Sequence, residues 1–193
     1  MPKNLELKAP LASFSRALRI ARALGARSRG VLLQTDTYYR TSSGRLKLRV
    51  VNGRAAELIA YARPDTARGR YSTYVVLPVR DHRLADGLFR VLLGVRVVVR
   101  KRRTLFLYRN ARIHLDAVEG LGAFVEFEVL VTRGKRQART LFDELVSAFG
   151  IDRRRMIAGS YSDILESRSK RRRSAPESRR RPLKSGRKKP LRA

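Results

Sequence analysis

Apolar and polar residues alternate along several short segments of the chain, which is the period of a half-buried β-strand. In the segment KNLELKA at 3–9, Asn4, Glu6 and Lys8 share one face and two leucines share the other. The same alternation predicts further strands at 30–40, 45–51, 57–62, 71–79, 96–102, 104–109, 111–117 and 123–132.

Three other segments have the period of an amphipathic helix. They cover 11–26, 82–93 and 135–149, and the last two end at Gly94 and Gly150. Strands and helices follow one another through short loops. This order predicts an α+β fold with a largely antiparallel sheet.

The predicted strands separate charge from apolar side chains. Lys47 and Arg49 share one face of their strand, as do His114 and Asp116, and Glu126 and Glu128. One interpretation is an open sheet whose polar face meets water. The alternative is a closed sheet with the charged faces turned inward around a wet lumen.

A lumen of this kind has a defined chemistry. Its basic side chains would bind phosphate oxygens, and its carboxylates would bind a hard cation such as Mg²⁺ or Mn²⁺. Without a metal, the carboxylates would repel phosphate. The two signs of charge together therefore indicate a metal–phosphate ligand.

Composition adds a strong positive charge to this picture. The 193 residues include 45 Lys and Arg against 16 acids, a net charge of +29, which calls for an anionic partner or ligand. The chain has no cysteine, so disulfides, thiolate zinc sites and cysteine nucleophiles are excluded. No secretory signal or membrane-spanning run is visible, and we expect a soluble cytoplasmic protein.

The end of the chain differs from the rest. Residues 166–193 hold 13 basic residues and two acids, and few apolar residues follow position 168. We therefore predict a globular domain at 1–165 and a disordered basic tail at 166–193. The tail would attract nucleic acid, polyphosphate or an anionic membrane without sequence preference, or it would be solvated without a dedicated partner.

Seven blocks of the sequence resemble a known family. NLELKA at 4–9, QTDTYYRTSSGRLKLR at 34–49 and RIHLDAVEGLGAFVEFE at 112–128 are similar to signatures of the CYTH domain. This is the superfamily of class IV adenylyl cyclases and thiamine triphosphatases. Four shorter blocks follow the family's order: YARPD at 61–65, RYSTY at 70–74, VRKRRTLFLY at 99–108 and GSYSDIL at 159–165.

The resemblance implies a triphosphate tunnel, a closed antiparallel barrel of about eight strands with amphipathic helices packed outside. It implies that the metal ligands are Glu6, Asp116, Glu126 and Glu128, with Asp116 either metal-linked or the general base. The implied catalytic residues are Asp116, Lys101 and Arg103. The implied triphosphate-binding residues are Lys8, Arg45, Lys47, Arg49, Arg63, Lys101 and Arg103.

One position departs from the family pattern. Asn4 stands where the family has the first Glu of its ExExK signature. An amide oxygen still binds a hard cation but brings no charge. The number of metal ions, one or two, therefore stays open.

Two reactions fit such a tunnel. In a cyclase, the ribose 3′ oxygen of ATP attacks the α-phosphorus and pyrophosphate leaves. In an inorganic, thiamine or nucleoside triphosphatase, water attacks the terminal phosphorus and phosphate leaves. The late block RIHLDAVEGLG resembles the cyclase branch, so we expect a cyclase-like enzyme, with the triphosphatase as the alternative. A nucleic-acid-binding module that uses the basic tail is the alternative of another class.

Overall fold

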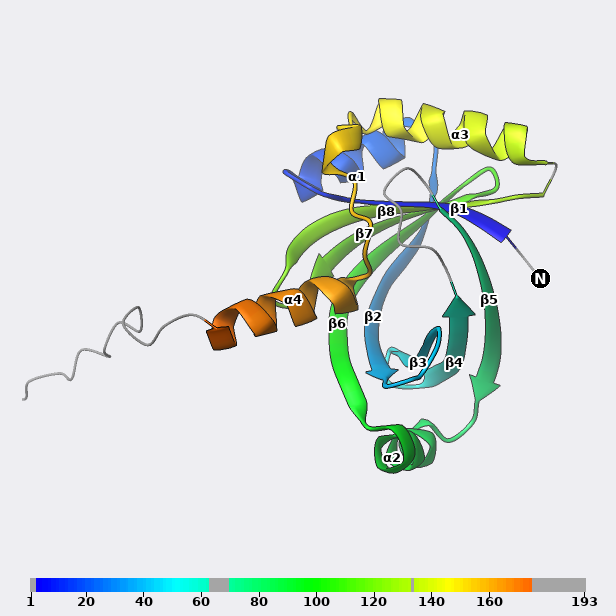
Figure 1. Ribbon diagram of the computed structural model, residues 1–193. Helices are drawn as coiled ribbons and strands as arrows, with labels where there is room; N and C mark the ends of the chain where they lie inside the picture. The colour runs from blue at the N-terminus through cyan, green and yellow to red at the C-terminus, as the bar shows by residue number, and fades with distance from the viewer. Residues whose placement is uncertain (1–2, 63–69, 133, 175–193) are drawn as a thin grey trace, which may run out of the picture.

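The computed structural model describes residues 3–62, 70–132 and 134–174, and it has the expected α+β architecture (Figure 1). Eight strands form one antiparallel sheet. They are β1 (Lys3–Pro10), β2 (Arg27–Tyr39), β3 (Arg45–Val51), β4 (Ala55–Ala62), β5 (Arg70–Val79), β6 (Val95–Tyr108), β7 (Ala111–Val118) and β8 (Gly122–Leu130). The helices are α1 (Phe14–Ala23), α2 (His82–Leu93), α3 (Lys135–Ala148) and α4 (Tyr161–Ser174), with a short 3₁₀ turn at Arg153–Arg155.

The sheet curls on itself. Its strand order is β1-β5-β4-β3-β2-β6-β7-β8, and β1 also pairs with β8. The β1–β8 ladder joins Asn4–Pro10 to Phe124–Leu130, whereas the β1–β5 ladder joins only Lys3–Glu6 to Arg70–Thr73. Only the short β1–β5 ladder therefore completes the ring of eight strands. Where this ladder ends, β1 and β5 are no longer paired, and the sheet has the form of a half-barrel. The eight-stranded antiparallel sheet is confirmed, but the closed barrel is confirmed only in part, because among the described residues β5 beyond Thr73 is not paired with β1.

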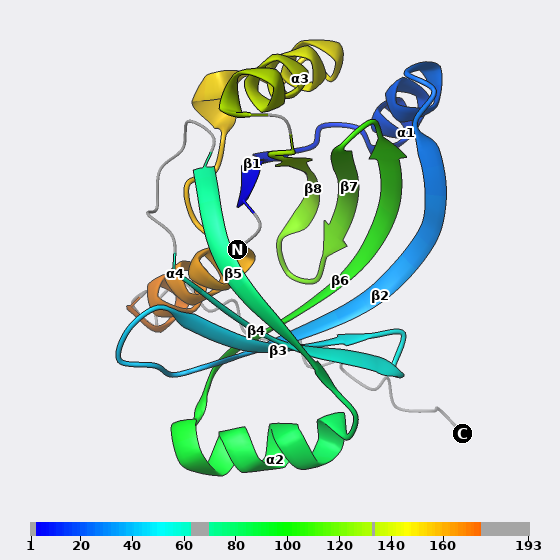
Figure 2. The same ribbon diagram turned by 90° about the vertical axis from the view of Figure 1, so that its right-hand side faces the viewer.

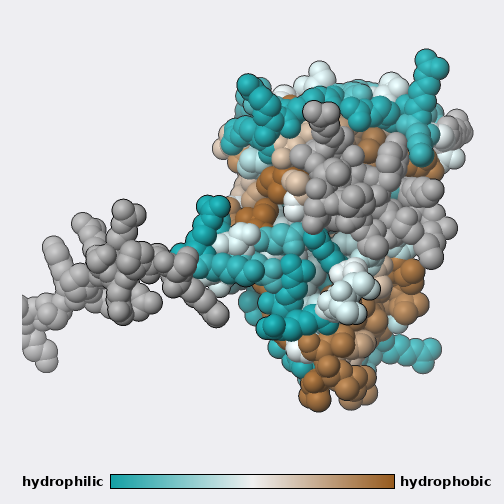
Figure 3. Space-filling view, in the orientation of Figure 1, coloured by the Kyte–Doolittle hydropathy of each residue, from teal (hydrophilic) through white to brown (hydrophobic). Residues whose placement is uncertain are grey.

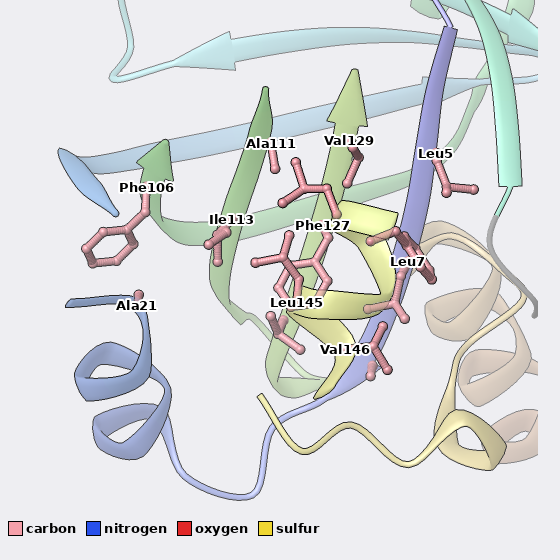
Figure 4. Close-up of a cluster of buried hydrophobic side chains, with 14 of the residues drawn as sticks. Leu5, Leu7, Ala21, Phe106, Ala111, Ile113, Phe127, Val129, Leu145 and Val146 are labelled. Atoms are coloured by element: carbon pink, nitrogen blue, oxygen red, sulfur yellow. The ribbon is translucent and has the colours of Figure 1, made fainter. Parts of the chain in front are cut away.

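The main hydrophobic core lies on the outside of the sheet. Apolar side chains of β1, β6, β7 and β8 pack against α1 and α3 (Figure 4). Among them, Phe127, Ile113 and Leu145 are fully buried, and burial of each contributes roughly 1.5–3 kcal/mol. Because successive side chains point to opposite faces of a strand, this outer core turns the intervening polar residues inward. Of the two interpretations of the strand pattern, the structure therefore agrees with the one in which the charged faces turn inward.

Capping residues mark the beginning of α1 and both ends of α2. Ser13 caps α1 by accepting a hydrogen bond from the Arg16 amide, and Asp81 caps α2 by accepting from two amides of its first turn. Gly94, with a positive φ of 71°, ends α2 as predicted. Within the described part of the chain, no helix combines the length and apolar character needed to cross a bilayer.

Two expectations are corrected. The strands predicted at 96–102 and 104–109 are one continuous strand, β6, because Arg103 keeps the extended pairing with both neighbouring strands. Disorder was expected from residue 166, but α4 carries the chain in a helix to Ser174, and Glu166 within it is ion-paired with Arg96 at 2.6 Å. Residues 175–193 lie outside the described residues.

Candidate functional site

The inward faces of the strands enclose a cavity of about 300 Å³. Its described lining contains equal numbers of acidic and basic side chains. The five carboxylates are Glu6, Asp36, Glu57, Glu126 and Glu128, and the five cations are Lys8, Lys47, Arg49, Lys101 and Arg112. The lining is thus close to neutral as a whole, although it is densely charged.

A buried aspartate on β2 organises two of these cations. Asp36 accepts a hydrogen bond from Lys47 Nζ at 2.9 Å, and its two oxygens accept from Arg49 Nε at 2.8 Å and Nη2 at 2.9 Å. Burial raises the pKa of the Asp36 carboxyl, but the charges of Arg49 and Lys47 outweigh burial and hold that pKa well below its usual range. Asp36 therefore stays ionised and fixes both cations at the cavity wall.

A second aspartate, Asp116 on β7, holds two cations of β6 in the same way. Both oxygens of Asp116 accept from the Arg103 guanidinium, each at 2.7 Å. Lys101 Nζ donates to Asp116 at 3.4 Å, and the Tyr161 hydroxyl donates to it at 3.0 Å. Asp116 is completely buried, and its carboxylate accepts hydrogen bonds from these three side chains. It lies behind the cavity wall.

The combined effect of burial and neighbouring charges lowers the pKa values of both Asp116 and Lys101 in this cluster, with different consequences for their charge. Burial raises the pKa of Asp116, but the charges of Arg103 and Lys101 outweigh burial and keep the pKa below its usual range. Burial and the nearby Arg103 charge lower the pKa of Lys101 to about 7, against the opposing effect of Asp116. The charge of Lys101 therefore changes near neutral pH.

A third cluster gathers the carboxylates of β8 around a histidine of β7. One ligand atom each from His114, Glu126 and Glu128 lies within 4.8 Å of the others. Burial and the Arg103 charge lower the pKa of His114 to about 4, so its imidazole is neutral at pH 7. Its Nδ1 is buried without a hydrogen-bond partner and lies 3.8 Å from Glu128 Oε1.

These residues fit a divalent cation. Two carboxylates and a neutral imidazole suit Mn²⁺, and carboxylate oxygens also suit Mg²⁺. Asn4, on β1, lines the same cavity, and its Oδ1 is buried without a hydrogen-bond partner. An unsatisfied buried oxygen costs free energy unless a ligand meets it.

Helix α4 covers one end of the cavity. Its first residue, Tyr161, lines the cavity, with Lys8 Nζ at 4.4 Å and Lys101 Nζ at 5.1 Å from the ring centre. Asp163 of α4 is ion-paired with Arg45 of β3 and with Arg96 of β6, each at 3.1 Å. Ion pairs to two strands thus hold α4 against the barrel.

Most of the residues predicted from the sequence meet in this cavity. The lining includes Glu6, Lys8, Lys47, Arg49, Lys101, Glu126 and Glu128. Asp116 and Arg103 stand directly behind it. Glu6 is not one of the three ligands of the His114 cluster, but it lies opposite Glu128 in the β1–β8 ladder. Arg45 is ion-paired with Asp163 of α4 and is not among the lining residues, and Arg63 lies outside the described residues.

Several residues of the site were not assigned from the sequence. Asp36 stands in the quoted block QTDTYY, and strand alternation with Lys47 and Arg49 could have placed it inward. His114 was predicted only to share the polar face of its strand with Asp116, and the structure places it beside the carboxylates of β8. Glu57 gave no sequence signal, because its strand lacks clean alternation, and Tyr74 stands in the quoted block RYSTY but was assigned no role.

Solved structures share this architecture. The PH1012 protein of Pyrococcus horikoshii OT3 is 24% identical, with 83% of this chain and 98% of that chain covered and a TM-score of 0.75. A Vibrio parahaemolyticus protein described as a candidate adenylate cyclase is 18% identical, with 84% and 97% covered and a TM-score of 0.70. HpAC1 of Hippeastrum, described as a candidate adenylyl cyclase with dominant triphosphatase activity, is 17% identical, with 88% and 96% covered and a TM-score of 0.60. At these identities the likeness shows the fold alone.

The sequence itself carries a family match. No protein with a curated description matches the chain. The profile of the CYTH domain, however, matches residues 2–161, which include all eight strands and the three clusters of the cavity. The chain belongs to the CYTH domain family.

Proposed function

We propose that this chain is a metal-dependent enzyme that acts on a triphosphate, in the manner of a class IV adenylyl cyclase. The observation that carries the proposal is the cavity itself, where Lys47, Arg49 and Lys101 share one enclosed space with Glu126 and Glu128. Cations of this kind neutralise phosphate oxygens, and the carboxylates are ligands for a divalent cation.

The charge balance of the cavity supports the need for a metal. Five cations and five carboxylates line it among the described residues, so it offers little net positive charge to a triphosphate. We propose that His114, Glu126 and Glu128 hold a Mg²⁺ or Mn²⁺ ion, with Asn4 and Glu6 nearby on β1. The ion would supply positive charge to the phosphate oxygens.

The protein's own groups would position the triphosphate. Lys47 and Arg49 are pre-oriented by Asp36, so binding loses little side-chain entropy. Lys101 would meet the phosphates from β6, and Arg103 would act through Asp116 by holding that carboxylate in place. We assign Asp116 to positioning and not to proton abstraction, because its oxygens accept from three donors and its pKa is lowered.

Aromatic lining favours a nucleotide as the substrate. Tyr38, Tyr61 and Tyr74 line the cavity beside its cations, and tyrosine rings stack on nucleobases. In the proposed reaction, the 3′ hydroxyl oxygen of ATP attacks the α-phosphorus and its proton passes to water. A new P–O bond closes the ring, the bond from the α-phosphorus to the bridging oxygen breaks, and pyrophosphate leaves.

Hydrolysis is the second candidate. The cavity of about 300 Å³ is at the small end of ligand sites, which span about 300–1,000 Å³. This size favours a short ligand such as a triphosphate group alone. Water would then attack the terminal phosphorus, and phosphate would leave.

Product analysis separates these candidates. Purified protein is incubated with ATP and Mn²⁺, and the products are resolved by chromatography. Cyclic AMP with pyrophosphate supports the cyclase, and orthophosphate supports the hydrolase. Activity should disappear in Glu126→Gln and persist in Asp143→Asn, a charge change on the outer face of α3. If ATP, tripolyphosphate and thiamine triphosphate are all left intact, the proposed enzyme is wrong.

A further inference from the structure

Helix α2 carries an apolar stripe on the side that faces away from the barrel. The inner side of the helix packs Phe89 against Tyr39, with ring centres 5.2 Å apart. The outer side exposes four large aliphatic residues in positions that share one helical face. They are Leu84, Leu88, Val91 and Leu92, which are 72%, 53%, 85% and 66% exposed.

The stripe forms part of a visible patch. Hydrophobic residues gather at the end of the molecule where α2 lies (Figure 3). On the neighbouring strand β5, Val75 and Leu77 are exposed as well. Scattered apolar residues on a surface need no explanation, but a contiguous patch of this kind marks a contact site.

The position of α2 fits a flat contact surface. The helix is seen end-on in Figure 1 and from the side in Figure 2, and in both views it lies at one extremity with the barrel on a single side. A planar partner could therefore meet α2 along its whole length without touching the rest of the protein.

The charges around the stripe favour an anionic partner. Arg90 is ion-paired with Asp86 at 2.7 Å, and the Asp86 carboxylate also accepts from the Tyr39 hydroxyl. Asp81 is occupied as the helix cap. Arg80 and Arg83 make no ion pair with any residue that the structure describes. With Arg80, Arg83 and Arg90 against Asp81 and Asp86, residues 80–93 have a net charge of +1, and the two arginines without an ion pair are available to a partner.

The same charge argues against a second copy as the partner. The chain has a net charge of +29, and two copies joined through α2 would bring like charges together. An anionic surface would instead be attracted by the arginines and by the basic residues of 166–193. The binding of a helix to a membrane surface increases with the apolar area that it buries and with its electrostatic attraction to anionic lipids, and this chain offers both contributions.

We propose that α2 docks this protein on an anionic lipid surface. The aliphatic stripe lies at the boundary between headgroups and acyl chains, and Arg80 and Arg83 contact lipid phosphates. The catalytic cavity takes no part in this contact, so the proposal stands independently of the reaction.

Vesicle co-sedimentation of the full chain tests the proposal. The vesicles contain equal parts of phosphatidylcholine and phosphatidylglycerol, or phosphatidylcholine alone. We expect binding to the anionic vesicles, and at least about tenfold weaker binding by the double variant Leu84→Ser/Val91→Ser. The control is Leu33→Ser, which changes an exposed leucine (61%) on β2, away from α2, and it should bind like the wild type.

The other outcomes each overturn the proposal. If the double variant binds like the wild type and Arg179→Glu/Arg180→Glu/Arg181→Glu loses binding, the tail alone is responsible. If light scattering finds a wild-type dimer that Leu84→Ser/Val91→Ser converts to a monomer, without vesicle binding, the stripe is covered by a second copy. Circular dichroism of each variant checks that the fold is kept.

Discussion

The Arg103 guanidinium holds the Asp116 carboxylate through two hydrogen bonds of 2.7 Å, at a depth where Asp116 has no exposed surface. Removing one partner of a buried ion pair leaves the other charge uncompensated. The Arg103–Asp116 pair therefore affects the free energy of unfolding as well as the arrangement of the cavity beside it.

Asp116→Ala should destabilise the fold by about 3–5 kcal/mol, because Arg103 and Lys101 would lose their shared counter-charge. Urea denaturation followed by circular dichroism measures the free energy of unfolding. The control is Asp143→Ala, whose ion pairs to Arg139 and Arg153 are on the surface and should contribute no more than about 1 kcal/mol. Equal losses in the two variants would show that the buried pair has no special importance.

Glu126→Gln and Glu128→Gln should each weaken Mn²⁺ binding by at least about tenfold, because each removes a charged ligand from the cluster with His114. Isothermal titration calorimetry with Mn²⁺ alone gives the affinity. Glu57→Gln removes a carboxylate of the same cavity outside that cluster and is the matched control. Mn²⁺ affinity that falls equally in all three variants would mean a diffuse charge effect and no defined site.

Asn4→Glu should strengthen metal binding by about tenfold, since it replaces a buried amide oxygen that lacks a partner with a charged ligand. Asn4→Gln keeps the amide and tests whether size alone matters. The same Mn²⁺ titration serves for both variants. An unchanged affinity in Asn4→Glu would place the ion away from β1.

Binding of a triphosphate should be coupled to proton uptake by Lys101. The pKa of this group is lowered to about 7 in the free protein, and a bound polyanion would raise it. At pH 6 Lys101 is already protonated, whereas at pH 8 binding must take up a proton, so affinity falls as the pH rises above 7.

Calorimetry in buffers of different ionisation enthalpy measures this uptake, with a non-hydrolysable ATP analogue as the ligand. His114, with a pKa of about 4, does not titrate in this range. Lys101→Arg keeps its charge throughout and should show no uptake at pH 8. Uptake that persists in this variant would assign the proton to another group.

Strand alternation was sufficient to predict much of the barrel. The faces of β1, β3, β7 and β8 follow a strict period of two, so Glu6, Lys47, Asp116 and Glu126 were placed inward correctly. Strand β6 carries charge on both faces, and its continuity across Arg103 is set by pairing with β2 and β7. Long-range pairing of that kind leaves no local pattern in the sequence.

The parts that the sequence missed depend on tertiary contacts. Helix α4 has little apolar periodicity, and its ion pairs from Asp163 and Glu166 to distant strands hold it in place. Arg45 is one of the residues ion-paired with α4, and its predicted phosphate-binding role stays a prediction. The cluster of His114 with Glu126 and Glu128 joins neighbouring strands in a register that composition does not specify.

The central claim is that one cavity binds a divalent metal and a triphosphate together. Its most direct test is calorimetric titration of a non-hydrolysable ATP analogue into the full chain, with and without Mn²⁺, in the wild type and in Glu126→Gln. We predict strong binding only for the wild type with Mn²⁺, because the neutral cavity lining needs the added charge. Equally strong binding without metal, or in Glu126→Gln, would contradict the account.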